Sequence, residues 1–153
     1  MPRTPRMVDI TKKPDVVRVA VAEGFIRLRK ETVKRIMAGE VEKGDPLSIA
    51  ALAAVLAVKN TPSIVMLAHN IPITSVKPEF EIRDDGVLAR VEVVTTAKTG
   101  VEMEALTAVA AALLNIWDVV KKYEKDEAGQ YPHTRIEYVR VVRKIKNSAG
   151  TGA

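Results

Sequence analysis

The sequence contains no cysteine, only two histidines and few aromatic residues. Without cysteine there is no disulfide framework and no thiolate metal site, and two histidines argue against a zinc centre. Aromatic residues make up 4% of the chain, which leaves little for stacking against nucleic-acid bases. These absences count against a disulfide-stabilised domain, a zinc enzyme and a protein that binds single-stranded nucleic acid.

The sequence also has no long hydrophobic run. The N-terminus is charged but is not followed by an apolar stretch, so no secretory signal is evident. The apolar run at 47–58 stops at Lys59 and is too short to span a bilayer. We therefore expect a cytoplasmic protein without a membrane partner.

The chain has the length of one domain, with 153 residues of which 47% are hydrophobic, enough for a proper core. Its net charge of +5 suggests a partner that carries phosphates. We expect a flexible basic arm at 1–13, a single catalytic domain at 14–146 and a flexible tail at 147–153.

Hydrophobic periodicity and turn residues predict the secondary structure. The expected order is a strand at 15–29 that bends at Gly24, helices at 30–38, 47–58 and 63–68, strands at 76–82 and 87–94, a long helix at 99–123 and a strand at 135–145. Gly39 should end the first helix, and Asp45 should cap the second, with Pro46 at its first position. The second helix is apolar almost all round, which predicts burial. This order indicates an α+β sandwich with an antiparallel sheet and helices on one face.

The predicted long helix carries two carboxylates, Glu102 and Glu104, in surroundings that are unusual for a charged group. Thr99 and Glu102 have the spacing of a capping box, so Glu102 should face the helix start. Glu104 shares a helix face with small and polar residues, namely Ala108, Ala111, Asn115, Asp118 and Lys122. A carboxylate on such a face favours burial and a raised pKa, and the face is predicted to contact another molecule.

Three other polar positions each allow a functional and a structural interpretation. Lys43 lies beside a helix N-terminus and could bind an anion, or it could simply precede the helix. His69 could carry protons, or it could stabilise the end of a helix. Asp118 and Lys121 have the spacing of an ordinary surface ion pair.

Taken together, several segments resemble one family. They are Met7–Ile10, Lys43–Asp45, Leu67–His69, Lys98–Ala108 and the pair Asp118 and Lys121, in that order. The chain resembles the cyclic pyranopterin monophosphate synthases of molybdenum cofactor biosynthesis from about Met7 to Lys144. The resemblance implies a ferredoxin-like fold and a homohexamer built as a trimer of dimers, with sites at the dimer interface. It also implies a lyase that converts 3′,8-cyclo-7,8-dihydroguanosine triphosphate to cyclic pyranopterin monophosphate and pyrophosphate.

The resemblance assigns roles to nine residues. The implied catalytic residues are Asp118, Lys43, Lys121 and Lys144, and the implied substrate-binding residues are Leu67, Ala68, His69, Met103 and Glu104. Lys146 lies on the same strand face and is an alternative to Lys144. Ala68 stands where the family usually has cysteine, which argues against a thiol role there. No cofactor or protein-held metal is firmly implied, although Mg²⁺ on the departing pyrophosphate is plausible.

Two interpretations from other classes remain open, a nucleotide-sensing domain and a nucleic-acid-binding domain, neither of them catalytic. Helix geometry adds one constraint on the enzyme interpretation. Glu104 and Asp118 are 14 positions apart, so on one helix they lie about 21 Å from each other. If both act on one substrate, they must come from different chains, related by a two-fold axis that sets the two long helices antiparallel.

Overall fold

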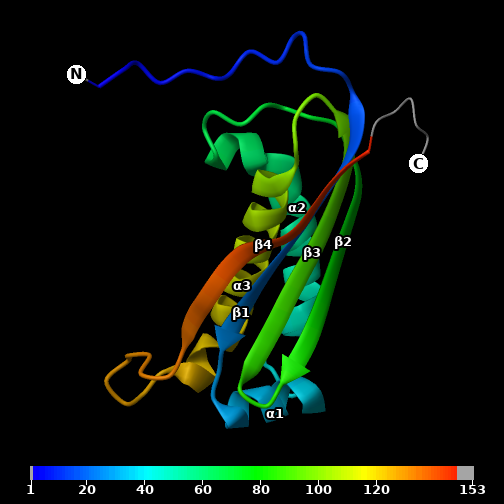
Figure 1. The fold of residues 1–153 in the computed structure, drawn as a ribbon. Helices are drawn as coiled ribbons and strands as arrows, with labels where there is room; N and C mark the ends of the chain where they lie inside the picture. The colour runs from blue at the N-terminus through cyan, green and yellow to red at the C-terminus, as the bar shows by residue number, and fades with distance from the viewer. Residues whose placement is uncertain (1, 148–153) are drawn as a thin grey trace.

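The computed structural model describes residues 2–147 and shows an antiparallel four-stranded sheet with two long helices on one face (Figure 1). The strand order is β2-β3-β1-β4. The elements are β1 (Val16–Arg27), α1 (Lys30–Ala38), α2 (Pro46–Ile64), β2 (Ile73–Arg83), β3 (Gly86–Ala97), α3 (Glu102–Glu124) and β4 (Arg135–Asn147). This confirms the predicted α+β class, and the arrangement agrees with a ferredoxin-like fold.

The core lies between α3 and the two central strands. In β1, Ala20 and Ala22 face the helices and are fully buried, and they pair with Val93 and Val91 of β3. The buried side chains of α3 that complete this layer are Ala105, Ala108, Val109, Ala112, Leu113, Ile116 and Val120. Because many of these residues are small, the helix can approach the sheet closely.

Gly24 is the point of closest approach. A Cβ atom there would lie 2.7 Å from Val109 Cγ1 and 2.8 Å from both Leu113 Cδ1 and the Tyr138 carbonyl oxygen. The predicted irregularity occurs only in the pairing of β1 with β4, where the register shifts on both sides of this glycine. Pairing with β3 continues unbroken. Glycine is therefore required here mainly because α3 packs directly against the β1 backbone.

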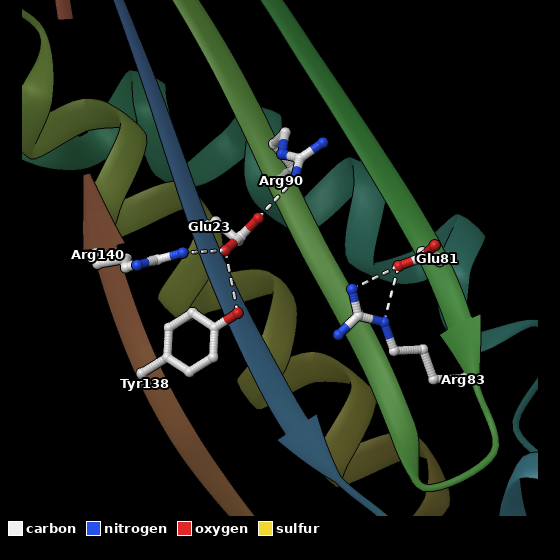
Figure 2. Close-up of polar contacts among 6 residues, drawn as sticks. All are labelled: Glu23, Glu81, Arg83, Arg90, Tyr138 and Arg140. Atoms are coloured by element: carbon white, nitrogen blue, oxygen red, sulfur yellow. Dashed lines mark hydrogen bonds and ion pairs between the residues drawn. The ribbon is translucent and has the colours of Figure 1, made fainter. Parts of the chain in front are cut away.

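The other face of the sheet carries a charged cluster centred on Glu23 (Figure 2). This buried carboxylate accepts hydrogen bonds from Arg90 Nη2 at 2.6 Å, Tyr138 Oη at 3.0 Å and Arg140 Nη2 at 3.1 Å. The hydrogen bond from Arg90 lowers the pKa of Glu23 most, with contributions from Arg140 and Tyr138, while burial opposes it. Glu23 thus links β1 to both neighbouring strands through its side chain.

The structure corrects the prediction of two helices at 47–58 and 63–68. They form one helix, α2, which continues through Pro62. In the turn before the proline, Asn60 Nδ2 and Thr61 Oγ1 donate to the carbonyls of Leu56 and Ala57, at 2.9 and 2.8 Å. These side-chain hydrogen bonds add to the turn before the proline, although the carbonyl that loses its backbone donor at Pro62 is that of Val58.

The burial predicted for this helix is also wrong on one side. Leu52 and Leu56 are 73% and 62% exposed, whereas the sheet-facing residues such as Ala50 and Ala54 are fully buried. By length and composition alone, α2 and α3 could each cross a membrane. The prediction that the apolar run is too short to span a bilayer is therefore also corrected. Both helices instead pack against the sheet or against each other.

The helix starts show one confirmed cap and one failed cap. Asp45 caps α2 by accepting from the amides of Leu47 and Ser48, as predicted, and Gly39 ends α1 in the left-handed conformation. The capping box expected for α3 is absent, because the helix begins after Val101 without a side-chain cap. Glu102 instead lies over Gly100, where a Cβ would be 2.1 Å from its Oε1 atom.

The remaining strands are longer than expected, and the predicted hairpin at 84–86 is present. Residues 2–13 contain no helix or strand. The flexibility expected of this arm remains a prediction. The expected tail at 147–153 lies almost entirely outside the described residues.

A buried carboxylate joins three elements at the end of the sheet where α1 lies. Glu124, the last residue of α3, is fully buried. It accepts from the Arg29 amide at the start of α1 at 3.1 and 3.2 Å, from Thr32 Oγ1, and from Thr134 Oγ1 at 2.6 Å just before β4. Each donor would be left without a partner if this carboxylate were lost.

Glu124→Gln should therefore destabilise the fold by about 1–3 kcal/mol, because an amide presents one acceptor oxygen and turns an NH₂ donor towards groups that donate. Urea unfolding measured by circular dichroism tests this. Glu127→Gln, on the exposed loop that follows, is the matched control and should leave the midpoint unchanged. Equal midpoints for the two variants would contradict the role given to Glu124.

Candidate active site

Three of the residues expected in the site meet near the C-terminal end of α3, and we call them the lysine–aspartate cluster: Lys43, Asp118 and Lys121. Lys43 Nζ lies 3.2 Å from Asp118 Oδ2 and 3.3 Å from the main-chain oxygen of the same residue. Lys121 Nζ lies 3.1 Å from Asp118 Oδ1, one helical turn further along. The contact between Lys43 and Asp118 joins residues that are 75 positions apart in the sequence. It therefore depends on the fold and not on neighbouring positions of one helix.

The cluster is a solvent-accessible group of charges. The side chains of Asp118, Lys43 and Lys121 are 58%, 49% and 42% exposed. Hydrogen bonds from Lys121 and then from Lys43 lower the pKa of Asp118, and their positive charges add to this effect. Asp118 is therefore an anion at neutral pH, held between two ammonium groups that remain accessible to a phosphate.

Lys122 is not part of this cluster. Its ammonium pairs with Glu42, in the loop between α1 and α2. Of the two lysines near Asp118 in sequence, the structure therefore brings only Lys121 to the carboxylate.

Glu104 occupies a different environment near the start of α3. It is 3% exposed and lines a small pocket together with Val58, Lys59, Pro62, Asn70, Ile71 and Ile73. Burial raises the pKa of Glu104, against the opposing effect of its own backbone amide. The burial and the raised pKa expected from the sequence are confirmed, and they make this carboxyl group easier to protonate than an exposed glutamate.

The other implied substrate-binding residues lie around the same end of the molecule. Asn70 connects the Glu104 pocket to the segment Leu67–His69, which follows α2. Leu67 and Met103 are 48% and 42% exposed, and Ala68 and His69 are half-buried. Nε2 of His69 lies 2.6 Å from the carbonyl oxygen of Val8.

Lys144 also lies at this end. Its ammonium is 3.6 Å from Glu102 Oε1, and its strand position is opposite Ala20 of β1. Lys144, the choice made by counting along the strand, is thus beside the first turn of α3. The contact is an ion pair without a hydrogen bond, since Glu102 Oε1 has no hydrogen-bonding partner.

The structure therefore divides the expected site between the two ends of α3. Figure 1 shows α3 running along the sheet, from the end where the N-terminal arm lies to the end where α1 lies. Glu104 is at the first end and the lysine–aspartate cluster at the other, about 21 Å away by helical rise. One chain alone does not bring all nine residues into one pocket.

Comparison with known proteins identifies the family of this chain. The family model described as "MoaC family" matches residues 7–147. The chain belongs to the MoaC family.

Relatives of known name cover nearly the whole length of this MoaC-family chain. A protein of Aeropyrum pernix named "Probable cyclic pyranopterin monophosphate synthase" is 62% identical over 92% of this chain and 96% of its own length. Proteins of the same name from Pyrococcus abyssi and Archaeoglobus fulgidus are 57% and 55% identical, covering 92% of this chain and 89% and 90% of their own lengths.

Sequence reasoning missed Arg18, which shapes the loop before α3. This arginine is 5% exposed, and it donates from Nε to the Ala97 carbonyl at 3.0 Å and from Nη2 to the Lys98 carbonyl at 3.2 Å. It thus fixes the start of the segment that carries Met103 and Glu104. The available signal was a charged residue on the helix-facing side of an otherwise apolar strand.

Within residues 2–147, no group of three or more histidine, aspartate and glutamate side chains gathers in a way that could hold a metal ion. The expectation about Mg²⁺ remains a prediction.

The cluster predicts a shift in titration. Lys121→Ala should raise the pKa of Asp118 towards its ordinary value, and Lys43→Ala should raise it by less, because each removes a positive charge that favours the carboxylate. The ¹³C carboxyl signal of Asp118 followed against pH measures both effects. Lys125→Ala removes the same charge from an exposed position beyond the helix and should not move the titration. A titration that is the same in all four proteins would rule out the cluster in solution.

Proposed function

We propose that this chain is a cyclic pyranopterin monophosphate synthase, converting 3′,8-cyclo-7,8-dihydroguanosine triphosphate to cyclic pyranopterin monophosphate with release of pyrophosphate. The observation that carries this proposal is the lysine–aspartate cluster. It places two cations and one carboxylate where a phosphorylated substrate can reach them. The names of the relatives within the MoaC family support the same reaction.

The cluster suits both halves of this chemistry. Lys43 and Lys121 can bind phosphate oxygens and neutralise the charge that develops on the departing pyrophosphate. Asp118 can accept a proton from the reacting group once the lysines have turned to the phosphates. Lys144 supplies a further ammonium from β4.

The Glu104 pocket suits the ring system of the substrate. Burial raises the pKa of Glu104, so its carboxyl group is protonated more readily than an exposed one, and in its protonated form it can donate a proton or a hydrogen bond to a ring nitrogen or oxygen. Met103 and Leu67 offer exposed apolar surface beside it, Ala68 belongs to the same segment, and His69 adds a polar ring. With alanine at position 68, the chemistry in this chain runs without a thiol.

We further propose that each site combines the lysine–aspartate cluster of one chain with the Glu104 pocket of a second copy. The exposed apolar side chains Leu52, Leu56, Ile64 and Leu114 lie on the faces of α2 and α3 that the sheet does not cover. A groove between these helices runs past Ala53, Ala57, Ala111 and Asn115. A two-fold contact across this groove would set the two α3 helices antiparallel and make two composite sites.

The residues at this proposed contact differ in one respect from the helix face that the sequence predicted to contact another molecule. Ala108 is fully buried against the sheet, so it cannot contact a partner, whereas Ala111 and Asn115 line the groove. Three such dimers would form the hexamer implied by the family.

We also propose a cytoplasmic location, because a triphosphate substrate does not cross membranes unaided.

Asp118→Asn should retain the fold and lose at least about 100-fold in turnover, since the amide has nearly the same shape but cannot accept the proton. The assay is incubation with the cyclised GTP intermediate, followed by detection of pyrophosphate and of the pterin product. Asp84→Asn, in the exposed turn between β2 and β3, is the matched control and should keep wild-type activity.

Two results would count against these assignments. Near-normal turnover by Asp118→Asn would remove this residue from the mechanism. If the wild-type chain binds the intermediate but returns it unchanged, the protein is a nucleotide sensor and not a synthase.

The composite site predicts complementation between two inactive variants. Glu104→Gln and Asp118→Asn chains, each inactive alone, would be unfolded and refolded together. In a mixed dimer one site collects both lesions and the other receives native Glu104 and native Asp118, so a substantial fraction of wild-type activity should return. Each variant refolded alone is the control. Mixed dimers that are verified by mass spectrometry and remain inactive would show that the two carboxylates do not share a site.

A further inference from the structure

The N-terminal segment contacts a residue of the implied substrate-binding set. His69 Nε2 is 2.6 Å from the Val8 carbonyl oxygen, across 61 positions of sequence. A carbonyl oxygen can only accept, so this contact requires the proton on Nε2. In the neutral ring the other nitrogen, Nδ1, is then the acceptor. The contact therefore decides which nitrogen of His69 can take up a proton or a hydrogen bond from a ligand.

The residues around Val8 have a local structure that holds this carbonyl in place, and we call residues 8–13 the strap. Asp9 Oδ1 accepts from the amide of Thr11 at 2.8 Å and from its hydroxyl at 2.5 Å. The Lys13 amide donates to the Ile10 carbonyl at 3.0 Å, and Ile10 is half-buried while its neighbours in the strap are exposed. The strap is thus folded into two successive turns with one partly buried apolar side chain.

The strap has a second attachment, to the loop that leads into α3. Lys98 Nζ donates to the Lys13 carbonyl at 3.0 Å and lies 3.9 Å from Asp15 Oδ1. The backbone carbonyl of Lys98 is in turn held by Arg18. The strap therefore connects the segment at 67–69 to the start of the segment that carries Met103 and Glu104. Figure 1 shows the N-terminal segment at that same end of the sheet.

We propose that the strap is a positioning element of the active site: the main-chain carbonyl of Val8 orients the His69 ring and leaves Nδ1 as the acceptor that faces substrate. The inference rests on the proposed function, in which His69 belongs to the substrate-binding end. It gives the N-terminal segment a role in substrate binding, whereas the sequence predicted only a flexible arm.

The proposal is tested with two deletions in the full-length, assembled protein. Deletion of residues 2–10 removes the Val8 carbonyl and the turn at Asp9, whereas deletion of residues 2–6 shortens the arm and retains Val8. A deletion ending at Val8 would be uninformative, because the carbonyl of Met1 would take its place. We expect the 2–10 deletion to weaken binding of the cyclised GTP intermediate at least about tenfold, and the 2–6 deletion to match wild type.

A spectroscopic readout separates positioning from a general structural role. The chain has only two histidines, so His133 serves as an internal reference. In wild type and in the 2–6 deletion, the Nε2–H proton of His69 should be protected from exchange with water and visible in ¹H–¹⁵N spectra. In the 2–10 deletion this signal should be lost, with His133 unchanged. Thr11→Pro, which removes the amide donor and the hydroxyl donor to Asp9 in a chain of full length, should have the same effect.

A double-mutant cycle shows whether the strap acts through His69. If it does, the 2–10 deletion should weaken binding in the wild-type background and have no further effect in a His69→Ala background. Equal losses in both backgrounds, or wild-type binding by the 2–10 deletion, would overturn the proposal. If the wild-type chain does not turn over the intermediate, the proposed function fails, while the His69 signal still reports on the strap.

Discussion

The close packing of α3 on the centre of the sheet is the constraint on which the rest of the structure depends. Gly24 allows it, because a side chain there would occupy the space of Val109 and Leu113. The helix is thereby fixed along the sheet over 23 residues, and every group it carries has a fixed place. The distance between Glu104 and Asp118 is therefore a property of the fold, which no side-chain movement within one chain can close.

The same packing gives the two carboxylates opposite properties. Glu104 lies where α3 meets α2 and β2, so it is desolvated and its pKa is raised. Asp118 lies on the solvent-exposed side of the helix beside Lys121 and Lys43, whose hydrogen bonds lower its pKa. One helix thus carries two carboxyl groups whose pKa values are shifted in opposite directions, upward at Glu104 and downward at Asp118. In the proposed antiparallel pair, both kinds of carboxyl group would lie around one substrate.

Local signals in the sequence were sufficient for the fold class and for features that depend on near neighbours. Asp45 with Pro46, Gly39 and the turn at 84–86 were predicted because each is stabilised by residues within a few positions. The capping box at Thr99 failed because Glu102 lies over Gly100 beside Lys144, a contact that comes from β4. The exposure of Leu52 and Leu56 was missed because hydrophobic periodicity cannot distinguish a buried apolar face from an exposed one. The residues of the site came from resemblance, and the structure brought three of them together.

In the proposed reaction, Asp118 and its two lysines would link substrate binding to proton transfer. Before substrate binds, the carboxylate is held as an anion by Lys121 and Lys43, and such solvent-exposed ion pairs contribute little stability. A phosphate, with more charge and more acceptor oxygens, can therefore draw both ammonium groups away at small cost. As they turn to the phosphate, Asp118 loses the interactions that lower its pKa and becomes a stronger base. In the proposed reaction, the carboxylate would thus gain its capacity to accept a proton when the phosphates of the substrate are in place.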